Sequence, residues 1–518
     1  MKKFFLKNVA MSLLALLPLI ASAYDAQIDG IYYNLDAGTK QATVTYGSSK
    51  YTGSVNIPSS VTYDGVTYSV TTIGGSAFSS CTGLTSVKIP NSVTEIGSRA
   101  FYYCRGLTAV TIPNSVTEIG YNAFGDCSGL TSITVESGNT VYDSRDSCNA
   151  IIESASNTLV AGCKNTVIPN SVTEIGFCAF YGCSGLTSID IPNSVTKIGD
   201  SAFYRTAWYN NQPDGVVYAG NVVYKYKGTM PENTSISIKE GTLGIGNYAF
   251  RDCSNLTEVT IPNSVTSIGG GAFLGCSGLT SVKIPNSVTS IGFGAFSPCS
   301  GLTSITVESG NTVYDSRDSC NAIIETASNT LIAGCKNTVI PNSVTSIGDC
   351  AFDGCTGLTS VTFPNSVTSI GIEAFARCSG LTEVTIPNSV TEIGDYVFAV
   401  CSGLTEVTIP NSVTDIGFYA FSDCSGLTKV YCYAENVPNT NSSAFNNVNV
   451  SDATLYVPSA SIEAYKAATP WSGFGKIVAL GGSESNLRGD VNGDGKVSMS
   501  DAMFIVNYLL NGKFPDEE

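Results

Sequence analysis

The sequence predicts a mainly β solenoid built from coils of 23 residues. Residues 381–403 read LTEVTIPNSVTEIGDYVFAVCSG, and residues 404–426 read LTEVTIPNSVTDIGFYAFSDCSG. The same frame recurs upstream from Leu84. A fixed period of this length indicates stacked coils, each of which buries its apolar side chains only against its neighbours.

The start of each unit alternates apolar and polar residues, which is the pattern of a half-buried strand. In residues 404–426 we expect Val407 and Ile409 to point inward and Glu406 and Thr408 to point outward. The strand is expected to stop at Pro410, because proline has no N–H to donate.

The rest of the unit supplies two further sides. Val413 and Ile416 are expected to return to the core, and Gly417 to take a positive φ where the chain turns. An Ala–Phe pair then opens a short third side, so stacking would build a column of phenylalanine rings. Copies of this phenylalanine are Phe101, Phe124, Phe180, Phe203, Phe250, Phe273, Phe296, Phe352, Phe375 and Phe421.

Eleven of the 18 cysteines occupy a single repeat position, which predicts a ladder of small, buried, free thiols. They are Cys81, Cys104, Cys127, Cys183, Cys253, Cys276, Cys299, Cys355, Cys378, Cys401 and Cys424. Two pairs outside this ladder, Cys148 with Cys163 and Cys320 with Cys335, are the better candidates for disulfides.

The unit LTSVKIPNSVTEIGSRAFYYC at residues 84–104 resembles the BspA-type leucine-rich repeats of bacterial surface proteins. The resemblance implies a right-handed leucine-rich-repeat solenoid in a secreted or surface-held protein. It also implies adhesion to an extracellular protein or glycan as the usual role. Fold alone does not identify the partner.

Composition narrows the function further. The formal net charge of −16 argues against nucleic acid or an anionic membrane as partner. The absence of histidine excludes a Ser-His-Asp triad, a Cys-His nucleophile and histidine-ligated metal sites. We therefore expect no enzyme. A carboxylate glycosidase stays as an alternative, although no buried acid pair is located.

The first 23 residues have the features of a signal peptide, with Lys2, Lys3 and Lys7 before an apolar run and a cleavage site after Ala23. The sequence therefore predicts a secreted or cell-surface protein. That apolar run is too short to span a bilayer comfortably, and we expect no transmembrane segment in the mature chain.

The predicted organisation follows the repeat count. It comprises a signal peptide at 1–23, an N-terminal cap at 24–83, the solenoid at 84–430, a C-terminal cap at 431–480, a linker at 481–486 and a calcium-binding half-module at 487–518. In the N-terminal cap we expect hairpins with turns near Gly47 and Gly65. In the C-terminal cap we expect a short helix around residues 462–467, followed by Trp471 covering the last coil.

Two longer units, near 130–185 and 302–357, are nearly identical at an offset of 172 residues. We expect each to project a hairpin, at 142–148 and at 314–320. Asp143, Arg145 and Asp146 would then place charge on the first hairpin, and Asp315, Arg317 and Asp318 on the second. These tips are either plain surface hairpins or contact sites.

An insertion at 206–243 departs most from the frame. It is expected to form a hairpin around residues 213–215 and 220–221. Trp208 and Tyr209 are candidate binding residues that could stack on sugar rings or anchor a protein. The alternative is that these rings pack the insertion onto the solenoid.

The tail carries a calcium-loop pattern, GDVNGDGKVSMSDAMFIVNYLL. Counted from Asp490, oxygen-bearing side chains fall at the spacing of a twelve-residue Ca²⁺ loop, and Lys496 at position 7 would offer its carbonyl. The expected metal ligands are Asp490, Asn492, Asp494, Lys496, Ser498 and Asp501.

This tail resembles half of a type I dockerin, a family that docks on cohesin domains. The resemblance implies Ca²⁺ as cofactor and a cohesin-like domain as partner, with Met499 and Ser500 at positions that help to choose the cohesin. The tail departs from the family in having one loop instead of two, and in having Met499 where a small polar residue is usual.

The outward face of the first strands is the broadest candidate binding surface. Glu258, Glu383 and Glu406 are its candidate binding residues, in a column otherwise rich in serine. Two hypotheses follow. The chain is a non-catalytic, exported, adhesion-type binding protein, or it is an accessory or scaffold subunit docked by its tail into a calcium-dependent, polysaccharide-handling complex.

Overall fold

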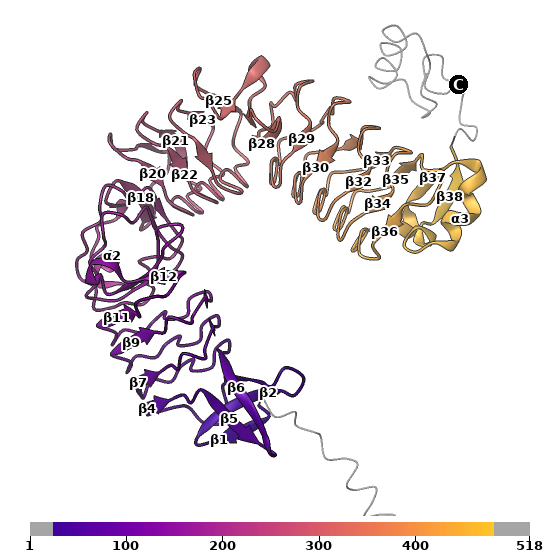
Figure 1. The fold of residues 1–518 in the computed structure, drawn as a ribbon. Coiled ribbons are helices and arrows are strands. Elements are labelled where there is room, and N and C mark those ends of the chain that lie inside the picture. Colours follow the sequence, from indigo (N-terminus) through magenta and orange to yellow (C-terminus); the bar gives the residue numbers. More distant parts are fainter. Residues whose placement is uncertain (1–23, 481–518) are drawn as a thin grey trace, which may run out of the picture. The chain divides into compact units, whose positions relative to one another are not determined.

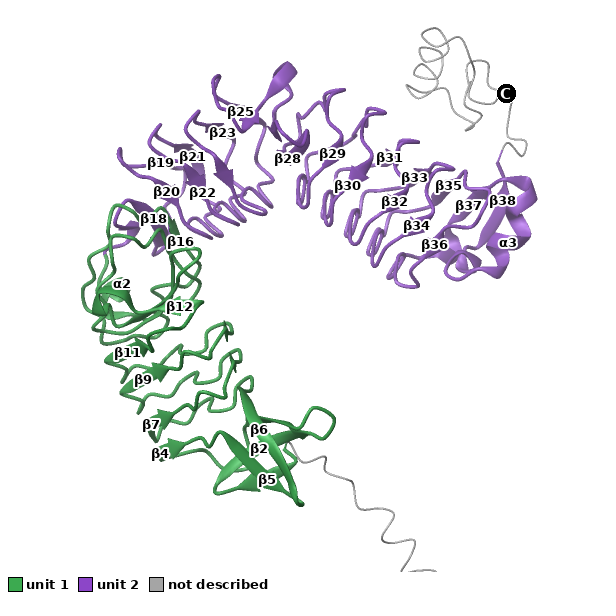
Figure 2. Cartoon of the chain, in the orientation of Figure 1, with its two compact units in different colours: residues 1–212 green, residues 213–518 purple. Residues whose placement is uncertain are grey.

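A computed structural model describes residues 24–480, which form two compact units (Figures 1 and 2). Unit 1 ends at Gln212, and unit 2 begins at Pro213. The predicted fold class, a mainly β solenoid of 23-residue coils, is confirmed in both units. The predicted signal peptide and calcium loop lie outside the described residues. Between residues 24 and 480, no helix has the length and apolar character needed to cross a bilayer.

In unit 1, the described residues 24–212 form sixteen short strands, the 3₁₀ turn η2 and the helical turn α2. They are β1 (Ala26–Ile28), β2 (Ile31–Asp36), β3 (Gln41–Thr45), β4 (Gly53–Asn56), β5 (Ser60–Tyr63), β6 (Val66–Ile73), β7 (Leu84–Lys88), β8 (Glu95–Ile96), β9 (Ala109–Ile112), β10 (Glu118–Ile119), β11 (Ser132–Val135), β12 (Tyr142–Asp143), η2 (Arg145–Ser147), β13 (Ala150–Glu153), β14 (Thr158–Gly162), β15 (Glu174–Ile175), β16 (Lys197–Ile198) and α2 (Ala207–Asn210).

Unit 2 continues the same alternation of longer and two-residue strands. Its first part has β17 (Gly215–Ala219), β18 (Val222–Lys227), β19 (Thr234–Ser237), β20 (Gly244–Ile245), β21 (Leu256–Thr260), β22 (Ser267–Ile268), β23 (Ser281–Ile284), β24 (Ser290–Ile291), β25 (Ser304–Val307), β26 (Tyr314–Asp315), η3 (Arg317–Ser319), β27 (Ala322–Glu325) and β28 (Thr330–Gly334).

The second part of unit 2 contains α3, the only helix among residues 24–480 that is longer than one turn. It has β29 (Ser346–Ile347), β30 (Ser369–Ile370), β31 (Glu383–Thr385), β32 (Glu392–Ile393), β33 (Glu406–Ile409), β34 (Asp415–Ile416), β35 (Lys429–Cys432), β36 (Asn439–Thr440), η4 (Val450–Asp452), β37 (Thr454–Val457), η5 (Ser459–Ser461), α3 (Ile462–Ala467), η6 (Trp471–Gly473) and β38 (Lys476–Ala479).

Each regular coil contributes to two parallel ladders, as the row of short arrows in Figure 1 shows. The first strands pair in register from coil to coil, as in β33 and β35, where Glu406 lies opposite Lys429. The two-residue second strands pair in the same way, with Ile393 of β32 opposite Ile416 of β34. Val407 and Ile409 are buried, as the alternation predicted.

The third side of a coil runs from the glycine after the second strand to the ladder cysteine, residues 97–104 in one coil. Its backbone bonds directly to the next coil: Phe78 N donates to Ala100 O at 2.7 Å, and Phe101 N donates to Ala123 O at 2.8 Å. The phenylalanine rings stack one coil apart, with Phe78 and Phe101 5.0 Å apart at 5°. The predicted phenylalanine column therefore exists within each unit.

The expectation of a positive φ at Gly417 is wrong. The left-handed residues on this side are Tyr419 (φ 54°) and Asp423 (φ 56°). Gly417 is needed for space, because a Cβ there would lie 2.9 Å from the backbone nitrogen of Asp395 in the preceding coil. Close contact between coils, and not turn geometry, therefore requires this glycine.

All eighteen cysteines lie within the described residues, and all are free thiols. The ladder position is buried, as predicted, but the two suggested disulfides do not form. Seven of the ladder thiols also have a polar role, as in Cys104, whose Sγ donates to Phe78 O of the preceding coil at 3.0 Å. The same bond joins Cys127 to Phe101, Cys276 to Phe250, Cys299 to Phe273, Cys378 to Phe352, Cys401 to Phe375 and Cys424 to Phe398.

Two ends of the solenoid are covered by aromatic clusters. At the N-terminal end β2 pairs with β3, and β3 runs parallel to β6, which begins the second ladder. The β5–β6 turn is at Asp64 and Gly65, as expected, but Gly47 instead lies against the ring of Tyr32. At the C-terminal end, the buried Trp471 packs edge-on against Phe445 at 5.5 Å and Tyr465 at 5.4 Å.

Each regular coil has a glycine directly after its second strand. Replacing this glycine by alanine should destabilise the fold only where the neighbouring coil leaves no room for a Cβ. At Gly292 a Cβ would lie 2.3 Å from Gly270 N, whereas at Gly394 nothing lies closer than 3.6 Å. We expect Gly292→Ala to lower the free energy of unfolding by about 1–3 kcal/mol, the usual cost of overpacking. Gly394→Ala is the matched control and should be neutral or slightly stabilising. Urea unfolding measures both, and equal effects would contradict the close-contact explanation.

The ladder thiols should be inert in the folded protein. Burial raises the pKa of Cys104, Cys299 and Cys401 to about 12, from an ordinary value of 9.0. We expect thiol reagents near pH 8 to leave the ladder unlabelled until the chain unfolds, because the thiolate is the nucleophile. Since folding raises these pKa values, the stability that they contribute is complete below pH 9 and is lost as the pH rises toward 12. Rapid labelling of native protein would contradict this.

Candidate functional site

The predicted metal ligands, Asp490 to Asp501, lie outside the described residues, so their geometry is not part of the structure. Within residues 24–480, no cluster of three or more cysteine or acidic side chains has a metal-binding arrangement. The calcium loop therefore stays a prediction from the register of its oxygen-bearing side chains.

The structure brings two of the three strand-face glutamates together. Glu383 of β31 lies opposite Glu406 of β33. Glu258 belongs to a different sheet, where its carboxylate accepts a hydrogen bond from Ser235 Oγ at 3.4 Å. Like charges on neighbouring strands repel each other, and Lys429 of β35 lies opposite Glu406 on its other side. Their binding role stays a prediction.

The aromatic residues of the insertion do not form one element. Trp208 belongs to the short helix α2 in unit 1, where Thr206 Oγ1 caps the helix by accepting from Tyr209 N. The indole ring of Trp208 packs on Phe203 at 4.6 Å, so it extends the phenylalanine column. Trp208 and Tyr209 are both half-buried, which agrees with the packing alternative. Their binding role stays a prediction.

The expected hairpin of the insertion lies in unit 2. Its strands are β17 and β18, which pair antiparallel around a turn at Gly220 and Asn221. The other expected turn, at residues 213–215, instead leads into β17, which begins at Gly215. The helix α2 was not predicted, because only four residues of the insertion form it.

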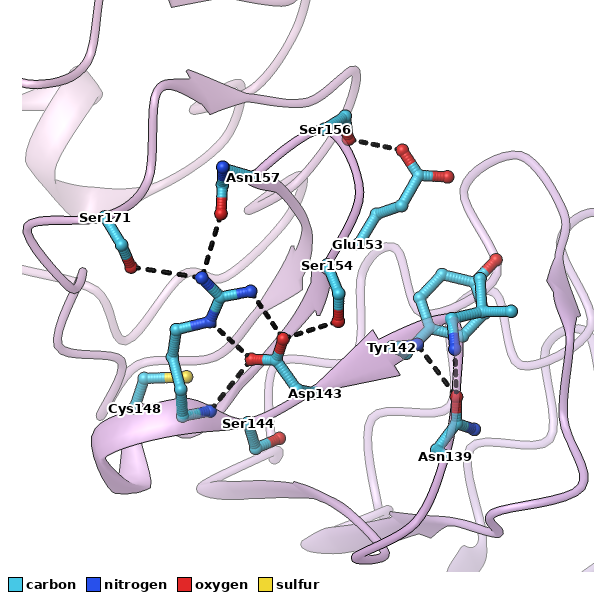
Figure 3. A network of polar contacts seen from close by, with 12 residues as sticks. Asn139, Tyr142, Asp143, Ser144, Cys148, Glu153, Ser154, Ser156, Asn157 and Ser171 are labelled. Atoms are coloured by element: carbon cyan, nitrogen blue, oxygen red, sulfur yellow. Dashed lines mark hydrogen bonds and ion pairs between the residues drawn. The ribbon is translucent and has the colours of Figure 1, made fainter.

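The segments 142–148 and 314–320 do not project as hairpins. Tyr142 and Cys148 are buried, and β12 is one strand of an antiparallel meander with β13 and β14. Arg145 Nε donates to Asp143 Oδ1 at 2.7 Å, and Arg145 Nη1 donates to Asn157 Oδ1 at 2.8 Å. Figure 3 shows how these groups converge.

This network repeats at Asp315, Arg317 and Asn329 with the same pairing. The aspartate and arginine expected at each tip therefore pair with each other inside the network. Of the six charged residues expected at the two tips, Asp146 and its copy Asp318 are the exposed ones. The segments are structural clamps of the two long units. The sequence could not show this, because the pairing depends on a loop that folds back on itself.

A surface that sequence reasoning missed lies on the third side of unit 1. Two arginines from different coils meet one buried carboxylate: Arg105 Nη2 lies 3.4 Å from Asp126 Oδ1, and Arg205 Nη1 lies 3.5 Å from Asp126 Oδ2. The Asp126 side chain is only 4% exposed. Gly182 permits this packing, because a Cβ there would lie 2.6 Å from Asp126 Cα.

Tyrosine rings surround this ion cluster. Tyr102 and Tyr181 lie 6.3 Å apart, Tyr181 and Tyr204 lie 5.4 Å apart, and Arg105 stacks on Tyr103 at 3.9 Å. Burial, with the neighbouring Tyr102, raises the pKa of Tyr181 to about 12, so its hydroxyl stays protonated. The tyrosine–arginine surface is defined here as Tyr102, Tyr103, Arg105, Asp126, Tyr181, Tyr204 and Arg205.

Unit 2 does not repeat this surface, despite the duplication. At the 172-residue offset, Tyr102, Tyr181 and Tyr204 are replaced by Leu274, Asp353 and Ala376. Arg205 becomes Arg377, which pairs with Asp353 at 2.7 Å. The signal that could have found the surface is this variation: the third-side positions change from coil to coil while the rest of the frame is nearly constant.

Comparison with protein-family models finds two matches. The BspA type leucine rich repeat region matches residues 51–156, 152–213, 222–327 and 325–451. The dockerin type I domain matches residues 488–518. No curated protein matches the chain.

Several solved structures are similar to this chain. A leucine rich cell surface protein from Faecalibacterium prausnitzii A2-165 is 28% identical, with 89% of this chain and 95% of that chain covered and a TM-score of 0.39. The pneumococcal vaccine antigen PcpA is 16% identical, with 88% and 98% covered and a TM-score of 0.42. A leucine-rich repeat protein from Bacteroides ovatus ATCC 8483 is 28% identical, with 79% and 94% covered and a TM-score of 0.29.

The hydrogen-bond network around Asp143 and Arg145, here called the clamp network, should stabilise the long repeat unit that contains it. Its copy around Asp315 and Arg317 should do the same in the second long repeat unit. Burial of Asp143 is outweighed by hydrogen bonds from Arg145 and Ser154, which lower the pKa of the carboxyl. We expect Asp143→Asn to lower the free energy of unfolding by about 1.5–3 kcal/mol, the value of hydrogen bonds to charged groups. The exposed neighbour gives the control, Asp146→Asn, with little expected effect.

The pH dependence of this difference follows from the lowered pKa. The stabilisation by Asp143 is complete above the ordinary carboxyl pKa of 3.8 and is lost as the pH falls below it. Unfolding measured at neutral and acidic pH should therefore show the wild type and Asp143→Asn converging in acid. A constant difference at all pH values would contradict the assignment.

Proposed function

Because the chain belongs to the BspA-type leucine-rich repeat family and ends in a type I dockerin domain, we propose that it is a non-catalytic extracellular binding subunit. In this proposal the solenoid holds a protein or glycan partner. The dockerin attaches the chain to a cohesin-bearing assembly that handles polysaccharide outside the cell.

The observation that carries the proposal is the dockerin match together with the register of its loop. Type I dockerin domains bind calcium and dock on cohesins. Asp490, Asn492, Asp494, Ser498 and Asp501 place oxygen at loop positions 1, 3, 5, 9 and 12, as a calcium ion requires. Calcium would order a segment too short to fold on its own apolar contacts, so docking should depend on the ion.

The solenoid supports a binding role through its construction. Its outward strand faces are open and polar, and the paired strands hold them rigidly in register. Rigid repeat surfaces lose little conformational entropy on binding an extended partner. Adhesion at the cell surface is the second candidate, supported by the match to the BspA type leucine rich repeat region.

Capture by immobilised cohesin domains tests the proposal. The mature chain should be captured in calcium and released by a chelator. Truncation after residue 480 should abolish capture. In the tail, Asp490→Ala and Asp494→Ala should each weaken capture at least about tenfold, through loss of charged ligands.

The matched control is Asp516→Ala, which lies in the same tail but outside the loop and should be neutral. Capture that persists in chelator would contradict calcium-dependent docking. If no cohesin captures the chain while cell-surface extracts still bind the truncated form, adhesion is the function instead.

A further inference from the structure

The arginines of the chain are placed selectively. Arg145 and Arg317 belong to the clamp networks, whereas the others that lie in the described residues occupy the third side or its edge. These are Arg99, Arg105, Arg205, Arg251 and Arg377. Four of the five lie over a tyrosine ring, and three of those four are in unit 1. Lysine would supply charge as well, so the choice of arginine indicates a use for its planar, multiply donating group.

The tyrosine rings of this surface differ from the phenylalanine rings beneath them. Phe180 and Phe203 stack at 5°, so each ring covers the face of the other. Tyr102 and Tyr181 are tilted by 46°, and Tyr181 and Tyr204 by 35°, so their faces are not closed by mutual stacking. Tyr204 is 41% exposed. Tyr181 and Tyr204 lie on adjacent coils, and the coil that carries Gly125 lies between Tyr102 and Tyr181. Open ring faces along one side of the solenoid suit a ligand made of repeating flat units.

The two arginines at the centre keep unused donors. Each contributes one nitrogen to Asp126 at 3.4 or 3.5 Å, longer than the roughly 2.7–2.9 Å of a tight charged hydrogen bond. Their side chains are 47% and 56% exposed, so both guanidinium groups are accessible to a ligand, although Arg205 also contacts Tyr204. Two guanidinium groups against one carboxylate leave a local positive charge on a chain whose net charge is −16.

We propose that the tyrosine–arginine surface binds an acidic polysaccharide, with Tyr102, Tyr181 and Tyr204 stacking on successive sugar rings and Arg105 and Arg205 binding its carboxylates. Sugar rings present a flat C–H face to an aromatic ring, and guanidinium pairs with carboxylate in a two-donor geometry. Asp126 acts as a positioning residue, because it holds both arginines from below without reaching the ligand. This inference deepens the proposed function, since it names the ligand class that the solenoid takes.

Binding of polygalacturonate to the full-length mature chain tests this, measured by calorimetry in chelator so that the dockerin loop plays no part. We expect Tyr204→Ala and Arg205→Gln each to weaken binding by about tenfold or more, as for removal of an aromatic or charged anchor. Compared with Arg205→Gln, the variant Arg205→Lys should regain the salt dependence of binding but not the full affinity. Lysine keeps the positive charge but lacks the planar guanidinium group that donates two parallel hydrogen bonds.

The matched control is Arg251→Gln, which removes an arginine over Tyr248 in unit 2, where Gly271 occupies the equivalent position of the next coil. It should leave binding unchanged. Circular dichroism melting curves show whether each variant is folded, and the exposed positions Tyr204 and Arg205 are chosen so that folding is retained.

Three results would overturn the inference. They are no binding of polygalacturonate by the wild type, equal binding of a neutral oligosaccharide such as cellohexaose, or equal binding of poly-glutamate, which would indicate an acidic protein partner. Because the assay contains no calcium, its failure leaves cohesin capture untouched. Failure of cohesin capture likewise leaves glycan binding by the solenoid intact.

Discussion

The structure depends on the contact between one phenylalanine ring and the ring one coil away. Centroids lie between 4.9 Å, for Phe352 and Phe375, and 5.6 Å, for Phe398 and Phe421. This spacing is close to the distance between paired strands, so the ring column and the two strand ladders share one repeat. The ladder cysteine completes the contact by donating its thiol to the phenylalanine carbonyl of the coil before. An apolar side chain of the same size would lose this bond.

That constraint separates positions that must stay constant from positions that can vary. Inward Leu, Val, Ile, Phe and Cys, and the close-contact glycine, are determined by the coil beside them. The outward residues of the third side have no such partner, and the chain uses them for tyrosine and arginine in unit 1. The two long units interrupt the column, and Gly162 and Gly334 make room there, because a Cβ on either would meet the ring of Phe180 or Phe352.

Much of this could be predicted from the sequence, because period and parity decide it. The inward Val407 and Ile409, the phenylalanine column and the buried cysteine ladder all follow from repetition of one unit. What repetition cannot show is how neighbouring coils meet. The sequence predicts a turn role for Gly417, whereas the preceding coil leaves no room for a Cβ there. The sequence predicts Arg145 at the tip of a hairpin, whereas its side chain folds back and binds Asp143. The cluster at Asp126 brings together Arg105 and Arg205, which are a hundred positions apart in the sequence.

The central claim is that a uniform scaffold places its recognition chemistry on the third side of unit 1. Hydroxyl-radical footprinting of the full-length mature chain, with and without polygalacturonate, tests this most directly, because it measures the oxidation of each tyrosine side chain separately. The account predicts that oxidation falls at Tyr102, Tyr103 and Tyr204, while Tyr248, Tyr396 and Tyr419 on the third side of unit 2 are unchanged. Equal protection of both sets, or protection confined to the strand-face pair Tyr431 and Tyr456, would contradict it.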